Sequence, residues 1–437
     1  MRLIKDAFNV VLVFSVIFMF KVISFIDSSM IVMAFLVIFS FFNKQYRKEV
    51  KNYCFSKKSM LLLLTFVLFS VWIILCCLLN LQTDFSYLKT LFHLLFQLIV
   101  CLFLYCFLKI NRRISSIPKY LIISFIIQSI IIILGIISPS VRTFLLSTKG
   151  EFEVELANHY GFRGASLAGS SFFGLSISFG LLFIIFFSNK NLIMKKNYIF
   201  ILISLVLLGI AGLSAGRVSA IGIIFGLLFF IVKGKRKFQF FINSIIIVLL
   251  FLILIPLLSS FFKKTISSNL SNTIDYFYFY ITEFFNSSSG GFMKTTSTEF
   301  MFSTMFFPVE LKTLLFGDGL YNVSTGYYMS TDSGIMRPIL YAGLPSLIFL
   351  FSIQYQIMNF FNFKRKDKFL FWTIFIFSII LQIKGEVIGF ANIFTTLLFL
   401  FSLSYENKKN QLSMGINFQQ GFIKKPNYDV ISNSNPA

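Results

Sequence analysis

The sequence predicts an all-α, polytopic integral membrane protein, and its composition and its apolar runs both lead to that class. The chain of 437 residues is 57% hydrophobic and contains 62 phenylalanines. Its mean hydropathy of +0.83 is unusual for a soluble domain. Apolar runs of about twenty residues, the length of a membrane-spanning helix, recur along most of the chain. The alternating pattern of an outer-membrane barrel is absent, so we expect about twelve transmembrane helices.

The positions of the basic residues predict the orientation of the chain. The formal net charge is +22, but Lys and Arg occur in short clusters between apolar runs rather than along one face. Such clusters mark cytoplasmic loops and attract anionic lipid headgroups. Membrane lipids are therefore expected partners and nucleic acid is not. The clusters are Lys44–Lys58, Lys109–Lys119, Lys190–Lys196, Lys233–Lys237 and Lys364–Lys368.

The clusters also set the number of crossings, and they place both termini in the cytoplasm. The first apolar run follows basic residues and lacks a small-residue cleavage site, which predicts an uncleaved signal anchor. The region Lys195–Lys237 has basic clusters at both ends, so it must cross twice and turn at Ser214–Arg217. The twelve predicted spans are Ala7–Phe25, Ser28–Phe42, Met60–Leu79, Leu88–Leu108, Tyr120–Ile137, Ser170–Phe187, Tyr198–Leu213, Val218–Val232, Phe240–Leu258, Pro338–Met358, Phe369–Ile383 and Val387–Ser404.

Residues 1–404 are predicted to form a single transmembrane domain with two long periplasmic loops. The first loop covers about residues 138–169. The large loop, about residues 259–337, lies between the ninth and tenth spans. Its aromatic pieces, Asp275–Phe285 and Phe300–Phe316, predict short amphipathic helices along the outer membrane surface. The polar residues 405–437 predict a disordered cytoplasmic tail.

Several chemistries have no signal in the sequence. The five cysteines show no metal-site spacing, and none falls in a segment placed outside the membrane, so no disulfide is expected. A phosphate loop, an HExxH motif and a nucleophile elbow are absent, and we expect no cofactor. The alternating Glu151–Glu155 segment fits a short strand whose acidic face could hold a cation. A solvated acidic face is the simpler interpretation, so no metal site is predicted.

The candidate ligand-binding residues are arginines on the predicted outer side. Arg163 lies in a stretch of glycines and serines that ends at Gly174, where backbone could approach an anionic ligand closely. Arg217 lies in a tight predicted turn, and Arg337 directly precedes the tenth span. Charges near membrane depth often mark substrate paths, whereas snorkelling to lipid phosphates is the alternative. We favour snorkelling for Arg142 and substrate binding for the other three.

Two residues are candidates for a catalytic base. His159 precedes Arg163 by one helical turn and could titrate near neutral pH, although a structural histidine is the commoner case. Asp332 precedes Arg337 closely and could accept a proton, or it could cap the following helix.

Four features together resemble the Wzy-type O-antigen and capsule polymerases of the O-antigen ligase/polymerase superfamily. The arginine-to-glycine element from Arg163 to Gly174 is similar to one in an outer loop of that family. Gly212–Arg217 resembles its Ser/Gly-Arg turn, and Leu315–Gly319 resembles its phenylalanine-glycine-x-glycine piece. Asp332–Gly343 resembles its Asp-led approach to the next span, with a tyrosine-x-glycine ending. The family pattern has a second arginine early in the large loop, where this chain offers Lys294.

The resemblance implies a metal-independent glycosyltransferase of the bacterial inner membrane. Such an enzyme transfers a growing glycan from undecaprenyl pyrophosphate onto a new lipid-linked repeat unit at the periplasmic face. A chain-length regulator and a flippase of the same pathway are the implied protein partners. The candidate site residues are Arg163, Asp332 and His159 for catalysis and Arg163, Arg217, Arg337, Lys294 and Gly174 for binding pyrophosphate and glycan. An O-antigen ligase, which transfers to lipid A-core, and a lipid-linked oligosaccharide flippase are the alternatives.

Overall fold

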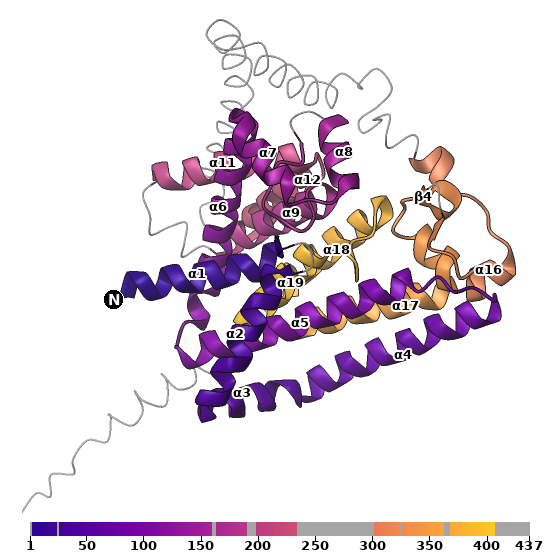
Figure 1. The fold of residues 1–437 in the computed structure, drawn as a ribbon, viewed down its shortest axis with the longest axis horizontal. Coiled ribbons are helices and arrows are strands. Elements are labelled where there is room, and N and C mark those ends of the chain that lie inside the picture. The colour runs from indigo at the N-terminus through magenta and orange to yellow at the C-terminus, as the bar shows by residue number, and fades with distance from the viewer. Residues whose placement is uncertain are drawn as a thin grey trace, which may run out of the picture.

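The computed structural model describes residues 2–23, 26–159, 163–189, 198–233, 301–323, 326–361 and 368–406 (Figure 1). The predicted span Phe240–Leu258, the segment Asp275–Phe285, Lys294 and the predicted tail beyond Glu406 lie outside these residues.

Most of the described chain is helical, and two short antiparallel hairpins, β1–β2 and β3–β4, lie between helices. In chain order the elements are α1 (Arg2–Phe18), β1 (Lys21–Ile23), β2 (Ile26–Asp27), α2 (Ser28–Phe42), α3 (Lys44–Cys54), α4 (Lys57–Leu79), α5 (Ser86–Ile110), η1 (Ile114–Ser116), α6 (Ile117–Ile137), α7 (Pro139–Ser147), α8 (Glu151–His159), α9 (Phe173–Ser188), α11 (Tyr198–Ala215), α12 (Ser219–Lys233), η3 (Met301–Met305), α16 (Leu311–Phe316), β3 (Asn322–Val323), β4 (Gly326–Tyr327), η4 (Tyr328–Ser330), α17 (Met336–Asn359), α18 (Lys368–Lys384) and α19 (Asn392–Glu406).

Among the described residues, 4 helices are long and apolar enough to cross a membrane, namely α4, α5, α6 with η1, and α17. The bent pair α2–α3 raises the number to 5, and shorter apolar helices lie within α9, α11, α12 and α19. These are the features of a mostly helical membrane protein, as the sequence predicts. Each predicted span that falls on described residues overlaps one helix, and α2 matches its predicted limits at both ends. The number of crossings stays a prediction, since 4 or 5 described helices meet the length and apolarity of a span.

The largest shifts in helix limits have local causes. Helix α1 ends at Phe18 rather than continuing to Phe25, because Met19 adopts a φ of 46° and the chain turns into the β1–β2 hairpin. Helix α19 begins at Asn392 rather than Val387. The N–H groups of Val387 and Ile388 instead donate to the Gln382 side-chain oxygen at 2.8 and 2.7 Å.

The structure corrects the prediction for the basic segment Lys44–Lys58. Rather than a loop, most of this segment is helix α3, which is bent by 119° from α2. The Asn43 side chain accepts a hydrogen bond from the N–H of Tyr46 at 2.9 Å and so caps the helix. The Tyr46 hydroxyl donates to the Phe103 carbonyl oxygen on α5 at 3.0 Å. A few apolar residues at helical spacing were therefore enough to bury one face of a strongly basic helix.

The strand interpretation of Glu151–Glu155 is wrong, because these residues form the first half of α8. Glu151 and Glu153 lie in the first turn of that helix, where carboxylates interact favourably with the exposed N–H groups of the helix start. Since alternate residues of a helix do not share a face, the segment has no acidic face of the kind that a strand would give.

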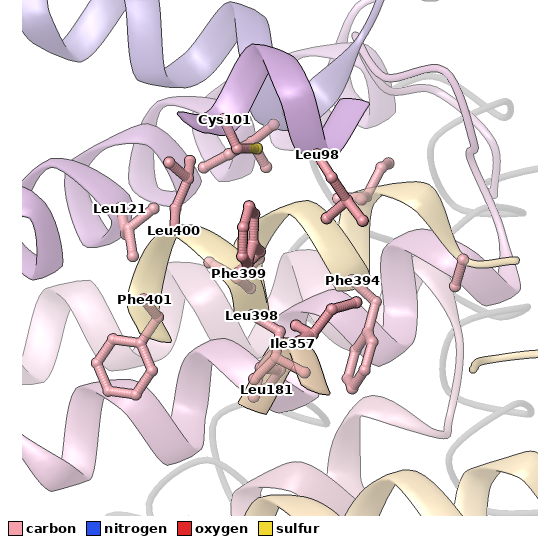
Figure 2. Packing of buried hydrophobic residues seen from close by; sticks show 14 of the residues in the cluster. Leu98, Cys101, Leu121, Leu181, Ile357, Phe394, Leu398, Phe399, Leu400 and Phe401 are labelled. Carbon is pink, nitrogen blue, oxygen red and sulfur yellow. The ribbon is translucent and has the colours of Figure 1, made fainter. Parts of the chain in front are cut away.

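Helix α19 lies at the centre of the packed interior, in contact with α5, α6, α9 and α17. Phe399 points toward Leu98 and Cys101 of α5, whereas Leu398 points the other way, toward Leu181 of α9 (Figure 2). All five side chains are almost completely buried. A helix that is apolar on every side is one that is surrounded by other helices.

Helices α9 and α12 approach each other more closely than side chains would allow. A Cβ atom added to Gly222 of α12 would collide with the backbone of Gly180 on α9. One turn further on, a Cβ on Gly226 would lie 2.6 Å from the Phe187 ring and 3.1 Å from the Phe183 carbonyl oxygen. Small residues permit this backbone contact, which is a common means of helix association in membranes.

The helices have two polar ends that differ in charge. At the end that carries α3 and η1, here called the basic end, ion pairs join neighbouring elements. Lys109 Nζ lies 2.6 Å from a Glu49 carboxylate oxygen, and Arg113 lies 3.4 Å from Asp6. The opposite end, here called the loop end, carries residues 80–85, 317–335 and 384–391, which hydrogen bonds connect to one another and to neighbouring helices.

We predict that Gly222→Ala destabilises the protein by about 1–3 kcal/mol, because the added methyl group must force α9 and α12 apart. Intrinsic helix propensity alone would make alanine stabilising at this position. A decrease in the free energy of unfolding can therefore be attributed to packing. Thermal unfolding of the purified protein in detergent measures it. Gly150→Ala is the control, since nothing lies within 4 Å of a Cβ at Gly150. Equal unfolding temperatures for the two variants would contradict the close contact.

Candidate functional site at the loop end

Arg163 reaches from the segment before α9 to the turn between α11 and α12. Its Nη2 atom donates a hydrogen bond to the Ala215 carbonyl oxygen at 3.0 Å and lies 3.7 Å from the position of a Cβ on Gly216. The Phe172 ring lies 5.3 Å from the guanidinium carbon. Two of the sequence features, Arg163 and the Gly212–Arg217 turn, therefore form one part of the structure.

A serine of α9 fixes the turn that carries Arg217. The Ser176 hydroxyl donates to the Gly216 carbonyl oxygen at 2.7 Å and accepts from the N–H of Ser219 at 3.0 Å. The Ser219 hydroxyl donates to the same Gly216 carbonyl at 2.9 Å. Helix α11 ends at Ala215 and α12 begins at Ser219, so the predicted tight turn is confirmed. The turn can be this tight because its polar backbone groups are satisfied by side chains.

Arg142 holds the backbone at Arg163 rather than only reaching toward lipid. Its Nη2 atom donates to the Ala157 carbonyl oxygen at 2.8 Å and to the Arg163 carbonyl oxygen at 3.4 Å. The next residue, Gly164, has a φ of +84°, and a Cβ there would lie 2.7 Å from the Ala157 side chain. The glycine after Arg163 is thus required by both conformation and space.

The segment that leads into α17 packs on the last turn of α18. The Ser333 hydroxyl donates to the Ile383 carbonyl oxygen at 3.2 Å and accepts from the N–H groups of Ile335 and Met336 at 3.3 and 3.4 Å. Ser333 therefore satisfies the helix start, which was a predicted alternative role of Asp332. Asp332 itself is exposed.

Arg337 is held in a buried ion pair at the start of α17. Its Nη1 atom lies 2.7 Å from a Glu386 carboxylate oxygen, and the two side chains are only 8% and 7% exposed. The rings of Tyr321 and Tyr327 each lie 3.9 Å from the guanidinium carbon. Its Nη2 atom donates to the Asn322 side chain at 3.4 Å. Protein groups thus surround much of this guanidinium.

Glu386 and Tyr321 complete this buried cluster. The Tyr321 hydroxyl donates to the same Glu386 oxygen that Arg337 contacts, at 2.5 Å. Burial raises the pKa of the Glu386 carboxyl, and the Arg337 guanidinium opposes that shift because it favours the charged form. The segment around Tyr321 is therefore attached to the start of α17 and to the loop after α18.

Asp84, between α4 and α5, attaches the same segment from another direction. One carboxylate oxygen accepts hydrogen bonds from the N–H groups of Tyr321 at 2.7 Å and Asn322 at 3.1 Å. The other accepts from the N–H and hydroxyl of Ser86. Although burial acts in the opposite direction, these hydrogen bonds lower the pKa of Asp84, as hydrogen bonding to a carboxylate does.

The two remaining sequence features contact each other. The N–H groups of Asp318 and Gly319 donate to the Leu340 and Tyr341 carbonyl oxygens at 2.6 and 3.1 Å. Helix α17 is kinked at Gly343, where φ is 72°, and the kink brings it against the end of α16. A Cβ at Gly343 would collide with the α16 backbone. Gly317 and Gly343 are therefore explained by close packing between the two features.

Lys384 is one of the residues at the loop end that were not predicted from the sequence. It ends α18, and its charge interacts with those of Arg217, Arg163 and Asp332. Neighbouring protein atoms remove part of the water around Asp332 and so raise the pKa of its carboxyl, although the residue keeps solvent access; the charges of Lys384 and Arg337 oppose this shift. The signal was present in the sequence, since Lys384 and Glu386 are the charged residues between two apolar runs.

The structure does not bring every predicted site residue together. Helix α8 ends at His159, but the histidine side chain falls outside the part that the structure describes, as does Lys294. Gly174 lies in the first turn of α9, where a Cβ would lie 2.6 Å from the Ser170 hydroxyl, and its carbonyl oxygen accepts from the Ser178 hydroxyl. Its observed role is packing and hydrogen bonding within α9.

Arg163, Arg217 and Lys384 thus define a cationic site, with Asp332 beside it, at the loop end of a helical membrane protein. Within the described ranges, His, Cys, Asp and Glu side chains form no group of three that could hold a metal ion. Fixed cations in a partly dehydrated place are suited to an anionic group. Neither a scan against protein-family models nor searches of curated proteins and of solved structures find a match for this chain.

We predict that Arg337→Lys lowers the free energy of unfolding by about 1–3 kcal/mol. Lysine keeps the charge, but an ammonium group cannot stack between two tyrosine rings or present several N–H donors in one plane. Thermal or denaturant unfolding in detergent measures the effect. Arg47→Lys, on the exposed face of α3, is the control and should be neutral. An unchanged stability of Arg337→Lys would show that the stacking contributes little.

Proposed function

We propose that the protein is an O-antigen or capsule polymerase of the Wzy type. It would transfer a growing glycan from undecaprenyl pyrophosphate onto a new lipid-linked repeat unit. The observation that carries the proposal is the convergence of Arg163 with the turn of Arg217, through the hydrogen bond to Ala215. These are two of the four features on which the resemblance rests, and a diphosphate carrier requires cations that act together.

In the proposed reaction, the acceptor hydroxyl oxygen bonds to the anomeric carbon at the reducing end of the donor glycan. The bond from that carbon to the phosphate oxygen breaks, and its electron pair remains on the pyrophosphate. Negative charge therefore grows on the leaving oxygen. Arg163 and Arg217 stabilise this charge, since fixed cations act more strongly where water is partly excluded.

The acceptor hydroxyl loses its proton as the new bond forms, and Asp332 is the residue to which we assign that proton. Asp332 is exposed and lies near the cationic site, so a sugar hydroxyl could reach it. Its raised pKa makes the carboxylate a stronger base than an ordinary aspartate. His159, the other candidate from the sequence, remains an alternative base. Arg337 supports the site by holding the Tyr321 segment in place.

We predict that Arg163→Ala lowers the rate of chain extension about a hundredfold or more, which corresponds to losing roughly 3 kcal/mol of transition-state stabilisation. Arg163→Lys should recover only part of that loss, because an ammonium group cannot bridge two phosphate oxygens. The assay uses purified protein and lipid-linked repeat units, with EDTA present because the proposed reaction needs no metal. Arg47→Ala is the matched control at the basic end.

Three outcomes separate this proposal from its alternatives. Near-wild-type extension by Arg163→Ala would remove its central residue. In a deletion strain, loss of polymerase leaves lipid A-core capped with single repeat units. Uncapped lipid A-core would instead indicate a ligase, and accumulation of lipid-linked units on the cytoplasmic side would indicate a flippase.

We further propose twelve spans in the inner membrane with both termini in the cytoplasm, an arrangement that places the loop end in the periplasm, where the proposed reaction must occur. We predict that alkaline phosphatase fused after Gly150, between α7 and α8, is active, because the enzyme folds only outside the cytoplasm. The same enzyme fused after Asn111, between α5 and η1, should be inactive. The reverse pattern would place the cationic site on the cytoplasmic side and exclude the proposed reaction.

A further inference from the structure

Lys384 is held in a fixed place by the residues that follow it. The backbone at Gly385 lies between α9 and the segment before α17. A Cβ there would lie 2.8 Å from the Phe173 ring, and Gly334 packs directly against the Gly385 carbonyl oxygen. Gln382 donates to the Gly334 carbonyl oxygen at 2.5 Å. The last turn of α18 is therefore fixed between the residues beside Arg163 and the residues beside Asp332.

The position of Lys384 brings a third cation to Arg163 and Arg217. Three positive charges that share a partly dehydrated site repel one another, and water screens them less than it would at an open surface. An anion bound among them would interact with all three charges at once. Asp332 is an acidic residue whose charge also acts on Lys384.

Arg337 is less suited to binding a diphosphate than its position in the sequence indicated. Its Nη1 atom is paired with Glu386 at 2.7 Å, its Nη2 atom contacts Asn322, and tyrosine rings lie 3.9 Å from its guanidinium carbon. To bind a diphosphate, Arg337 would have to leave the ion pair and expose a buried carboxylate, which is costly. The charge of Lys384 is not committed to a close ion pair of this kind among the described residues.

We propose that Lys384 is the third cation of the diphosphate site and contacts the phosphate that becomes the leaving group, together with Arg163 and Arg217. The proposal rests on the function proposed above, and it assigns the third position to Lys384 rather than Arg337. A lysine contributes a point charge with three donors, so it can follow a phosphate group that shifts as its bond to the sugar breaks.

The site predicts a pH dependence whose direction can be stated. Burial, followed by the charges of Arg217 and Arg163, lowers the pKa of Lys384, and Asp332 opposes the shift. As the pH rises through this lowered pKa, Lys384 loses its proton, and affinity for an anion falls earlier than with an ordinary lysine. An arginine at position 384 would stay charged throughout.

Binding of inorganic pyrophosphate to the purified full-length protein, measured by isothermal titration calorimetry, tests the proposal without any transfer reaction. Lys384→Ala should weaken binding about tenfold or more, as expected for loss of one charge-assisted contact. Lys384→Arg should retain most of the affinity. Lys368→Ala is the matched control at the other end of α18 and should bind as wild type does. Unfolding temperatures confirm that all variants are folded.

The comparison of Lys384→Arg with wild type at pH 7 and at a higher pH gives a second measurement. Pyrophosphate itself changes its protonation with pH, but it does so equally in both experiments. The ratio of the two dissociation constants therefore reports only the effect of the side chain at position 384. Wild type should weaken relative to Lys384→Arg as the pH rises. Unchanged affinity in Lys384→Ala, with folding intact, would overturn the proposal, and so would a ratio that is independent of pH.

One further variant separates this proposal from the proposed function. If Arg163→Ala weakens pyrophosphate binding and Lys384→Ala does not, only the assignment of Lys384 is wrong. If neither variant weakens binding, the cationic site does not hold a diphosphate, and the proposed function loses its donor site as well.

Discussion

The close contact between α9 and α12 is the constraint on which the cationic site depends. Apolar side chains gain little by leaving lipid for one another, so helices in a membrane associate through close packing and hydrogen bonds. Gly180 and Gly222 let the two backbones touch, and this contact places Ser176 beside the turn that it hydrogen-bonds. Arg163, which precedes α9, then meets the same turn. The geometry of charges at the loop end is therefore set by small residues within the helix bundle.

The loop end contains two kinds of charge that serve different purposes. Arg337 and Glu386 neutralise each other where both are buried, and removing either would leave an uncompensated charge. Together with Asp84, they attach the segment around Tyr321 to three separate parts of the chain. Arg163, Arg217 and Lys384 are instead like charges that lie close together. The buried pair and Asp84 attach the loops to the helices. This attachment lets the three cations keep a fixed arrangement.

Hydrophobic length was sufficient to predict a mostly helical membrane protein and its long apolar helices, because a chain in lipid must satisfy its backbone hydrogen bonds within each span. The limits of α2 and the turn before Arg217 follow from this rule. Helix α3 could not be predicted in this way, because its basic composition is typical of a loop. Its buried face is evident only from its packing on α5. The acidic segment of α8 was ambiguous because a run of five residues is too short to distinguish the 3.6-residue repeat of a helix from the two-residue repeat of a strand.

The candidate site was predicted only where a local sequence signal marks a residue. Arg163 and Arg217 carry a local signal, since glycines and serines surround each of them. The partner of Arg337 could not be predicted, because the Arg337–Glu386 pair joins residues from different loops and has no spacing rule. In the sequence, Lys384 is only a charged residue at the end of a predicted span, with no local signal of a binding site. Its proximity to Arg217 depends on the path of the chain between α12 and α18.

The most direct measurement of the central claim is a cryo-electron microscopy structure of the protein in nanodiscs with a lipid diphosphate that cannot be transferred. The account predicts density for the two phosphates among Arg163, Arg217 and Lys384, with the Arg337–Glu386 ion pair intact. Phosphate density beside a released Arg337, or at the basic end near α3, would contradict it.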